Sequence, residues 1–127
     1  MRSKVETPQA PQAIGPYSQA IKANGFLFTS GQIALDPATG QMAVTHAVAQ
    51  TKQVMENLGA ILNAAGLTFA DVVKTTIFLT DLSDFVRVNE AYGSYFETDP
   101  PARSTVQVSA LPKGAKIEIE AVAVLRE

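Results

Sequence analysis

Two charged side chains near the end of the chain have the types and the setting that carboxylic-acid chemistry requires. Arg103 stands in Pro-Pro-Ala-Arg-Ser-Thr-Val-Gln-Val (residues 100–108), and Glu118 stands between two isoleucines in Lys-Ile-Glu-Ile-Glu-Ala (residues 116–121). The planar guanidinium of an arginine holds a carboxylate through two parallel hydrogen bonds. A glutamate can deprotonate a water molecule as a general base. This pair is the strongest chemical lead in the chain.

Both segments alternate in the manner of a β-strand, and a loop at Pro112-Lys113-Gly114 joins them. Side chains of a strand point alternately to its two faces, so each strand should have a core face and a charged face. The expected core residues are Val106 and Val108 in the first strand, and Ile117, Ile119, Ala121 and Ala123 in the second. The charged faces then hold Arg103, Thr105 and Gln107 in the first strand, and Glu118, Glu120, Val122 and Val124 in the second.

The charged face of the second strand has two interpretations. Alternating charge is typical of an antiparallel sheet with one face in water, where the charges are only solvated. This face becomes apolar at Val122 and Val124, however, which favours burial against another surface such as a second subunit. Charges buried in such an interface are costly unless they are paired or take part in chemistry.

Composition limits the classes of protein to which the chain can belong. Its 127 residues are 46% hydrophobic, which suits a single domain over 1–127 with its own core. The absence of cysteine excludes disulfides, thiolate metal sites and a cysteine nucleophile. The single histidine, His46, argues against a zinc site or a histidine-based triad. The net charge of -2, with scattered lysines and arginines, leaves no electrostatic footprint for nucleic acid.

Signals for membrane insertion or secretion are not recognisable in the sequence. No apolar run approaches the roughly 20 residues of a membrane span. The start, Met1-Arg2-Ser3-Lys4-Val5-Glu6, has no apolar region of the kind found in a signal peptide. We therefore expect a soluble cytoplasmic protein that does not bind membranes.

Ahead of the two late strands, the pattern predicts four more elements. Asn24-Gly25 indicates a tight hairpin turn between two strands, and apolar residues at helical spacing indicate two helices. The expected elements are strands over 17–23 and 26–33, a helix from Thr45 to Gly66, a strand over 69–82, and a helix from Ser83 or Asp84 to before Pro100.

This order predicts an α+β fold in which two helices cover one face of a mixed sheet. Two helices cannot cover both faces of such a sheet. The other face would carry Tyr17, the late valines and glutamates, and either Ile77 or Phe78. We therefore expect this face to pack against other copies in an oligomer.

Four separated motifs resemble those of one protein family. They are Pro-Gln-Ala-Ile-Gly-Pro-Tyr-Ser-Gln-Ala (11–20), Phe-Thr-Ser-Gly-Gln (28–32), Asn-Glu-Ala-Tyr (89–92), and Pro-Ala-Arg-Ser (101–104) through Leu111 with Ile-Glu-Ile (117–119). In this order, and over essentially the whole chain, they are similar to the RidA family, also called YjgF/YER057c/UK114.

The resemblance implies a chorismate-mutase-like α+β subunit that forms a homotrimer with sites in the clefts between subunits. It implies a 2-iminobutanoate/2-iminopropanoate deaminase that acts in metabolite damage control. Such an enzyme hydrolyses reactive 2-enamine and 2-imine acids, such as 2-aminoacrylate, to 2-keto acids and ammonia. The implied ligand is a small 2-imino or 2-keto acid, and no metal or organic cofactor is implied.

The resemblance also assigns roles to residues of this chain. Arg103 would hold the substrate carboxylate, and Glu118 rather than Glu120 would position and deprotonate the attacking water. Tyr17 would orient that water or assist proton transfer. The backbone at Gly31 would bind the nitrogen-bearing end of the substrate. Further contacts are expected from Ser30, the backbone of Thr105, and Asn89. Some relatives carry cysteine in place of Thr105, so regulation through oxidation of that thiol is not available here.

Three alternatives remain open at this level. The same clefts would serve a keto-acid sensor or a chaperone-like trimer without turnover, although a sensor needs the arginine and no base. A larger imine such as 2-aminomuconate would fit a wider pocket. An endoribonuclease, as reported for some relatives, would need a basic groove that the net charge of -2 argues against.

Overall fold

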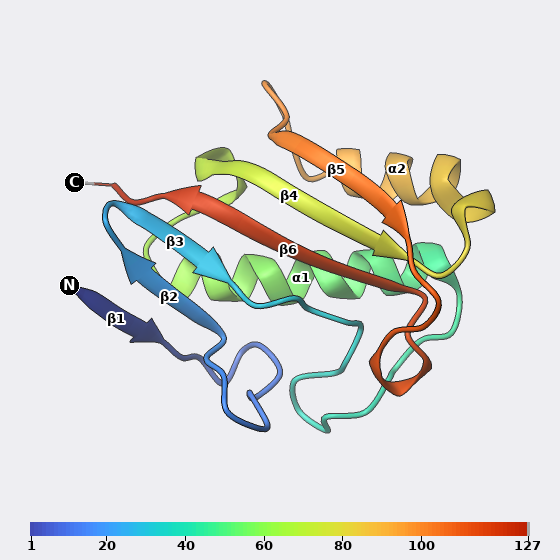
Figure 1. Ribbon diagram of the computed structural model, residues 1–127, viewed down its shortest axis with the longest axis horizontal. Coiled ribbons are helices and arrows are strands. Elements are labelled where there is room, and N and C mark those ends of the chain that lie inside the picture. Colours follow the sequence, from blue (N-terminus) through green and yellow to red (C-terminus); the bar gives the residue numbers. More distant parts are fainter. Residues whose placement is uncertain (127) are drawn as a thin grey trace.

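The computed structural model describes residues 1–126, which form one six-stranded sheet with two α-helices packed on a single face (Figure 1). The strand order is β1-β2-β3-β6-β4-β5, and only β4 and β5 run parallel. The mixed α+β architecture predicted from the sequence is therefore confirmed. The elements are β1 (Arg2–Val5), β2 (Ala20–Ala23), β3 (Phe26–Thr29), α1 (Ala47–Ala64), β4 (Val72–Leu79), α2 (Phe85–Gly93), β5 (Ala102–Gln107) and β6 (Ile117–Val124).

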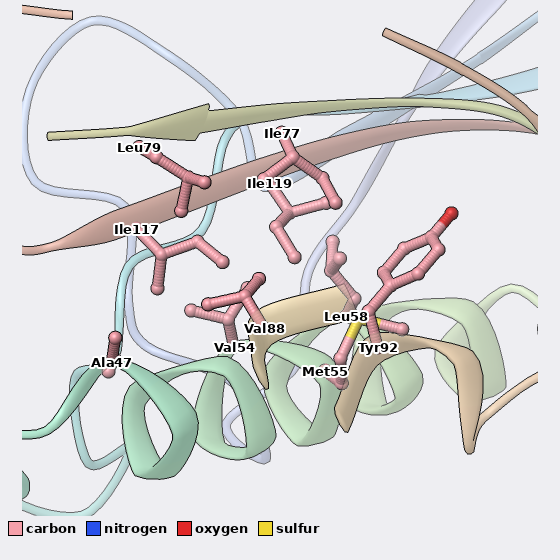
Figure 2. Close-up of a cluster of buried hydrophobic side chains, with 11 residues drawn as sticks. Ala47, Val54, Met55, Leu58, Ile77, Leu79, Val88, Tyr92, Ile117 and Ile119 are labelled. Carbon is pink, nitrogen blue, oxygen red and sulfur yellow. The ribbon is translucent and has the colours of Figure 1, made fainter. Parts of the chain in front are cut away.

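The helices and the sheet enclose a continuous apolar core. Figure 2 shows part of it, where α1 and α2 face β4 and β6. The predicted core face of β6 is confirmed, because its isoleucines and alanines are all buried. Fully buried side chains from α1, β4 and β6 include Leu58, Ile61, Leu62, Ile77, Leu79, Ile117 and Ile119. Burial of each such side chain stabilises the fold by about 1.5–3 kcal/mol relative to exposure.

The predicted boundaries of the first two strands were too wide. The Asn24-Gly25 turn has the positive φ angles, 51° and 83°, that a tight hairpin requires. The first strand starts at Ala20 rather than Tyr17, because the main chain turns sharply where the Tyr17 amide donates to the Gly15 carbonyl over 2.9 Å. The second strand ends at Thr29. The residues that leave these strands are the ones that reach the candidate site.

The strand β1 was not predicted. Three of its four residues are exposed and only Val5 is buried, so the segment has almost no apolar periodicity. Charged residues are common on strands at the edge of a sheet, where they discourage pairing with other chains.

Helix α1 lies within the expected segment. His46 is its N-cap, one residue later than the predicted Thr45, and the positive φ of 78° at Gly66 ends it as expected. The predicted strand over 69–82 is shorter at both ends, because residues 69–71 and 82–84 form 3-10 turns. Helix α2 then starts at Phe85, directly after the second turn.

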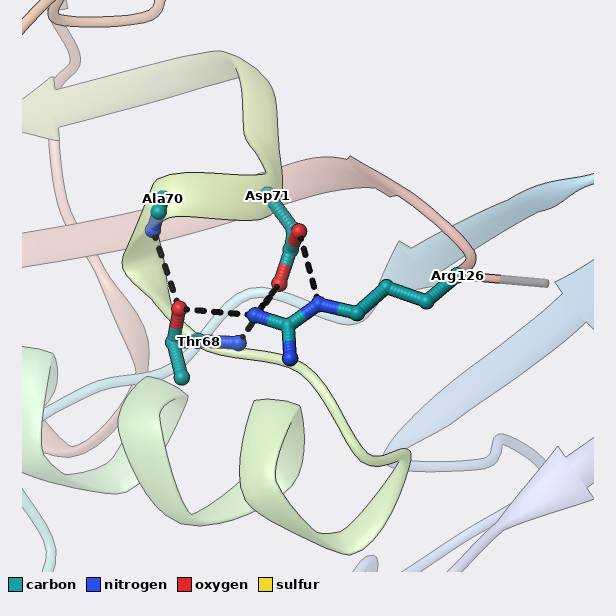
Figure 3. Close-up of polar contacts among 4 residues, drawn as sticks. All are labelled: Thr68, Ala70, Asp71 and Arg126. Carbon is teal, nitrogen blue, oxygen red and sulfur yellow. Dashed lines mark hydrogen bonds and ion pairs between the residues drawn. The ribbon is translucent and has the colours of Figure 1, made fainter.

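The 3-10 turn at Phe69–Asp71 also fixes the C-terminal segment. Thr68 and Asp71 form a capping box, and the Arg126 guanidinium donates to both side chains (Figure 3). The Arg126 hydrogen bond, together with the Thr68 amide, lowers the pKa of Asp71. An exposed pair of this kind contributes at most about 1 kcal/mol.

The faces predicted for β5 were wrong. Residues that pair across a sheet point to the same side, and Arg103 pairs with the buried Thr75, as Thr105 does with the buried Ile77. Arg103 and Thr105 therefore point to the helical side. Val106 pairs with Phe78 on the open face and is 42% exposed. The physical reason is that α2 lies beside β5, where an arginine side chain can pack along the helix, whereas the valine is left for the uncovered face.

Candidate active site

The structure separates the predicted site residues into two groups on opposite sides of the sheet. Glu118 pairs with Phe78 and shares the open face with it, whereas Arg103 points to the helical side. A single chain therefore does not bring the guanidinium and the carboxylate together. We call the group around Glu118 the glutamate half-site (Tyr17, Ser30, Gly31 and Glu118) and the group around Arg103 the arginine half-site (Asn89, Arg103 and Thr105).

Direct contact between Gly31 and Glu118 defines the glutamate half-site. Beyond the end of β3, the main chain of Gln32 pairs with Ile119 of β6 through two hydrogen bonds of 2.9 and 3.1 Å. This bridge brings Gly31 so close to the Glu118 side chain that a Cβ at position 31 would overlap the carboxylate. Any larger residue at position 31 would therefore displace the Glu118 carboxylate.

The electrostatic setting of Glu118 makes it a stronger base than an ordinary glutamate. Burial of its side chain, and secondly the negative charge of Glu120, raise the pKa of Glu118 from its ordinary value. Neither carboxylate is in an ion pair within residues 1–126, where the pairs formed are Lys4–Glu6, Arg87–Asp84 and Arg126–Asp71. A raised pKa suits a group that must take a proton from water near neutral pH.

Tyr17 and Ser30 line the same groove, which has a volume of about 930 Å³. The Ser30 hydroxyl donates to the carbonyl of Ser18 over 2.6 Å, and the Ser30 amide donates to the carbonyl of Gln19 over 2.9 Å. The Tyr17 side chain is 53% exposed. These bonds tie the segment that carries Tyr17 to the end of β3, so that a phenol and a serine hydroxyl share one side of the molecule with Glu118.

The buried amide of Gln19 holds this irregular segment in place. Its Oε1 accepts from the Thr7 amide over 2.7 Å, and its Nε2 donates to carbonyls of the same segment, including Pro11 at 2.8 Å and Thr7 at 3.1 Å. Gln19 is only 2% exposed. Sequence reasoning did not single it out, since a lone glutamine before a strand is usually a surface residue. Its one signal was its place in the Ile-Gly-Pro-Tyr-Ser-Gln motif.

The arginine half-site is built on one face of α2. Phe85, Asn89 and Tyr92 are spaced four and three residues apart, which places them together on a helix. The Arg103 Nη1 donates to Asn89 Oδ1 over 2.6 Å. The guanidinium carbon lies 5.5 Å from the ring centre of Phe85 and 5.2 Å from that of Tyr92, within the range of cation–π attraction. Donors of the guanidinium that do not face Asn89 remain for a ligand.

Tyr92 is itself anchored behind the arginine. Its hydroxyl shares a buried hydrogen bond of 2.6 Å with Thr75 of β4, and burial raises the pKa of this phenol. Phe85 and Tyr92 are among the apolar residues at helical spacing in the segment predicted as the second helix. The structure shows that both rings also contact the candidate ligand-binding arginine.

Thr105 lines a shallow cavity of about 400 Å³ together with Leu82, Phe85 and Arg103. All three residues of the arginine half-site are thus in one place. In the glutamate half-site, Gly31 approaches Glu118, and Tyr17 and Ser30 line one groove. In residues 1–126, histidine, aspartate and glutamate side chains form no cluster of three or more that would suit a metal ion. Neither helix in this part of the chain has the length and apolarity needed to cross a bilayer.

Comparison with known proteins assigns this chain to a family. The family model for endoribonuclease L-PSP matches residues 7–125. Protein DfrA of Myxococcus xanthus is 61% identical over 125 residues, covering 97% of this chain and 95% of the relative. The human 2-iminobutanoate/2-iminopropanoate deaminase is 50% identical over 124 residues, covering 98% of this chain and 90% of the relative. The crystal structure of E. coli TdcF with bound serine matches with a TM-score of 0.93 and 45% identity, covering 98% and 99% of the two chains.

The fold is therefore that of one α+β family. The chain belongs to the endoribonuclease L-PSP family, also known as the YjgF/RidA family. The resemblance inferred from the four sequence motifs is confirmed.

Proposed function

We propose that this protein is an imine deaminase that hydrolyses small 2-enamine and 2-imine acids, such as 2-aminoacrylate and 2-iminopropanoate, to 2-keto acids and ammonia. The observation that carries the proposal is an unpaired carboxylate of raised pKa in contact with Gly31, in a chain that also holds a preorganised guanidinium. Its relative of 50% identity is named for this activity. Serine, bound in the structure of E. coli TdcF, resembles a 2-imino acid in carrying nitrogen on the carbon next to a carboxylate.

A homotrimer would supply complete sites from these two halves. The open face of the sheet exposes Phe26, Phe28, Val106 and Val124 beside Glu118, and such an apolar surface favours burial by another subunit. When each subunit packs this face against the β5–α2 side of the next, the contact is head-to-tail and closes into a ring. Every cleft of the ring then joins the glutamate half-site of one subunit to the arginine half-site of its neighbour.

Hydrolysis at such a cleft follows from the chemistry of the groups. Arg103 holds the substrate carboxylate and so fixes C2, which carries the imine nitrogen. Glu118 takes a proton from water as the water oxygen bonds to C2, and the electron pair of the C=N bond moves to nitrogen, which receives that proton from Glu118. Glu118 then takes the hydroxyl proton of the resulting aminoalcohol and returns it to the nitrogen, so that the C–N bond breaks, ammonia leaves and the water oxygen remains as the keto oxygen. No cofactor is needed.

The remaining predicted residues have supporting parts in this scheme. The Tyr17 hydroxyl orients the water or passes on a proton, and the backbone at Gly31 binds the nitrogen-bearing end beside Glu118. Ser30 and the backbone of Thr105 provide further ligand contacts. Asn89 was predicted as a ligand contact. In this structure its side-chain oxygen accepts a hydrogen bond from Arg103, so a ligand contacts Asn89 only beside that hydrogen bond. Because such imines already hydrolyse in water, positioning of water and carbon can supply most of the acceleration.

The test is the release of keto acid from freshly generated 2-aminoacrylate, with the uncatalysed background subtracted. Wild type is compared with Arg103→Ala and Glu118→Gln after each protein has been shown to have the same oligomeric state. We expect wild type to accelerate release and both variants to fall to background. A wild type that releases keto acid no faster than background would rule out deamination of this substrate.

Two further measurements, of keto-acid binding and of 2-aminomuconate turnover, separate the alternatives. Keto-acid binding without turnover would indicate a sensor or chaperone-like trimer, and turnover of 2-aminomuconate alone would indicate a larger substrate. RNA cleavage, the activity in the name of the family model, is disfavoured by the net charge of -2. We place the enzyme in the cytoplasm, without nucleic-acid or membrane partners. The carboxylate base favours the deaminase over the sensor, because binding a keto acid requires no base.

A further inference from the structure

One wall of the cavity beside Arg103 is held by the strand that carries the arginine. Leu82, in the 3-10 turn before α2, lines this cavity together with Phe85 and Arg103. The main-chain amide of Leu82 donates to the side-chain oxygen of Gln107 over 2.8 Å. Gln107 belongs to β5, so the bond joins the strand to a turn that lies 25 residues earlier in the sequence. The position of Leu82 therefore depends on Gln107.

Gln107 lies on the helical side of β5, because it pairs with the buried Leu79 of β4. Arg103 lies on the same side, and its guanidinium carbon is 5.5 Å from the ring centre of Phe85. The strand therefore contacts the start of α2 through the arginine and the preceding turn through the glutamine. A glutamine at an exposed position is usually only solvated. The bond of Gln107 to a distant main-chain amide indicates a positioning role instead.

Leu82 is an apolar side chain that its turn fixes without burying it. The side chain is 46% exposed, so the core does not account for its position. Two hydrogen bonds hold the turn: the one from the Leu82 amide to Gln107, and one of 2.9 Å from the Ser83 amide to the side chain of Asp81. A leucine held in this way at the edge of a cavity suits contact with a ligand.

The proposed ligands have one apolar part. In a 2-imino or 2-keto acid, C2 carries a carboxylate, a nitrogen or oxygen, and a carbon chain. Arg103 takes the carboxylate, and the glutamate half-site takes the nitrogen or oxygen. The chain is left for the apolar walls of the cavity, which are Leu82 and Phe85. Burial of each CH2 group against such walls strengthens binding by about fourfold.

We infer that Gln107 is a positioning residue, which holds Leu82 against the carbon chain of the substrate and so sets the preference for longer apolar chains. This inference rests on the proposed function, because it takes a 2-imino or 2-keto acid as the ligand of Arg103. Gln107 acts through the main chain of Leu82 and makes no contact with the ligand. The residue thus governs selectivity rather than the chemical step.

The inference predicts a change in selectivity rather than in general affinity. Wild type should bind 2-oxopentanoate about tenfold more tightly than pyruvate, because its two additional CH2 groups lie against a shallow cavity. Gln107→Leu keeps the size of the side chain but removes the acceptor, so the ratio should fall to about threefold, as expected for one lost hydrogen bond. Its pyruvate binding should stay within about twofold of wild type, since Arg103 is untouched. Gln107→Glu keeps an acceptor oxygen and should keep the wild-type ratio.

The experiment measures binding of both acids by isothermal titration calorimetry, on the full-length chain in its native oligomeric state. Leu82→Ala removes the wall itself and should lower the ratio as Gln107→Leu does. The double variant should lower it no further, because Gln107 acts through Leu82. Gln53→Leu is the matched control: it makes the same substitution at a glutamine of α1 that donates to Asn57, and it should keep the wild-type ratio.

Three results would overturn the inference. The first is an unchanged ratio in Gln107→Leu. The second is an equal weakening of pyruvate and 2-oxopentanoate binding, or dissociation of the oligomer, since Gln107 would then serve the fold in general. The third is a further fall of the ratio in the double variant, which would show that Gln107 and Leu82 act independently.

Failure of this inference can be told apart from failure of the proposed function. If wild type deaminates 2-aminoacrylate while the binding ratio does not depend on Gln107, only the positioning role is wrong. If the ratio depends on Gln107 as expected but no turnover is seen, the positioning role stands and the deaminase does not. A wild type that neither binds these acids nor turns over 2-aminoacrylate overturns both.

Discussion

The two half-sites are built in different ways. The glutamate half-site takes Tyr17, Ser30 and Gly31 from irregular segments, which are held by the Gln19 amide and by the bridge between Gln32 and β6. The arginine half-site takes its residues from regular elements, a helix face and a strand, and several contacts converge on one guanidinium.

This difference matches the two tasks. A base must place water and carbon in line, where a misplacement of about 1 Å costs about 10²-fold in rate. A substrate carboxylate bound by the stacked guanidinium needs less precise placement. The guanidinium of Arg103 is itself held by several contacts, so the loss of one of them leaves others in place. Substitutions in the glutamate half-site should therefore mainly lower kcat. Substitutions around Arg103 that keep the arginine itself should mainly raise KM.

The largest effect is expected from mixing two inactive variants. Arg103→Ala and Glu118→Gln should each be at background, whereas trimers assembled from an equal mixture should recover about one quarter of wild-type activity per site, because one cleft in four joins two intact halves. Activity is measured after joint unfolding and refolding, with each variant refolded alone as the control. No recovery would mean that both groups act from the same chain.

Gly31→Ala tests how closely the glutamate half-site is packed. The new methyl group would displace the Glu118 carboxylate, so we expect kcat to fall by about 10²-fold with the fold intact. Gly93→Ala is the matched control, since nothing lies within 4 Å of a Cβ at that position. Steady-state kinetics and melting curves of both variants provide the comparison. Equal kcat values in the two variants would show that the contact with Glu118 is not required.

Asn89→Ala tests the redundancy of the arginine half-site. The guanidinium would lose its 2.6 Å hydrogen bond but keep both aromatic contacts. We expect KM to rise about tenfold, the value of one charge-assisted hydrogen bond, with kcat within about threefold of wild type. Arg87→Ala, on the same helix but away from the site, is the control. A collapse of kcat instead would place Asn89 at the reacting atoms.

The smallest effect is a shift in the pH profile. Glu118 must be ionised to act as a base, so activity should be lost as the pH falls through its raised pKa. Glu120→Gln removes a neighbouring negative charge and should lower that pKa, which moves the acid limb of kcat/KM to lower pH. The larger cause, burial, remains, so the limb should stay above the ordinary glutamate range. Glu90→Gln, on α2, should leave the profile unchanged.

Much of the fold could be read from the sequence because its signals are local. The hairpin turn, the helix that ends at Gly66 and the alternation in β6 each depend on a few neighbouring residues. The strand β1 lacked such a signal, since only Val5 is buried. The faces of β5 were assigned wrongly because the valines looked like core, and only the position of α2 beside β5 reveals which side is covered.

The sequence suggested candidate residues for the site but not their arrangement. Resemblance to the family supplied Glu118, Arg103 and Gly31, yet strand alternation placed the two charged groups on equivalent faces. Their true separation depends on the register of β5 and β6 with β4, which is a long-range property. The supporting roles of Gln19 and Tyr92 were not predicted, because they come from partners distant in the sequence.

The place of β6 in the sheet has a consequence for how the chain folds. This strand is the last to be synthesised, yet it lies in the middle, between β3 and β4. Until residues 117–124 emerge from the ribosome, no strand joins the N-terminal strands to the β4–β5 pair by backbone hydrogen bonds. Each of the two groups then exposes an unpaired strand edge. Completion of the sheet therefore waits for the synthesis of residues 117–124 and depends on contacts between distant parts of the chain, which slows folding. A nascent chain that stops before Ile117 holds two sheet fragments rather than a shortened sheet.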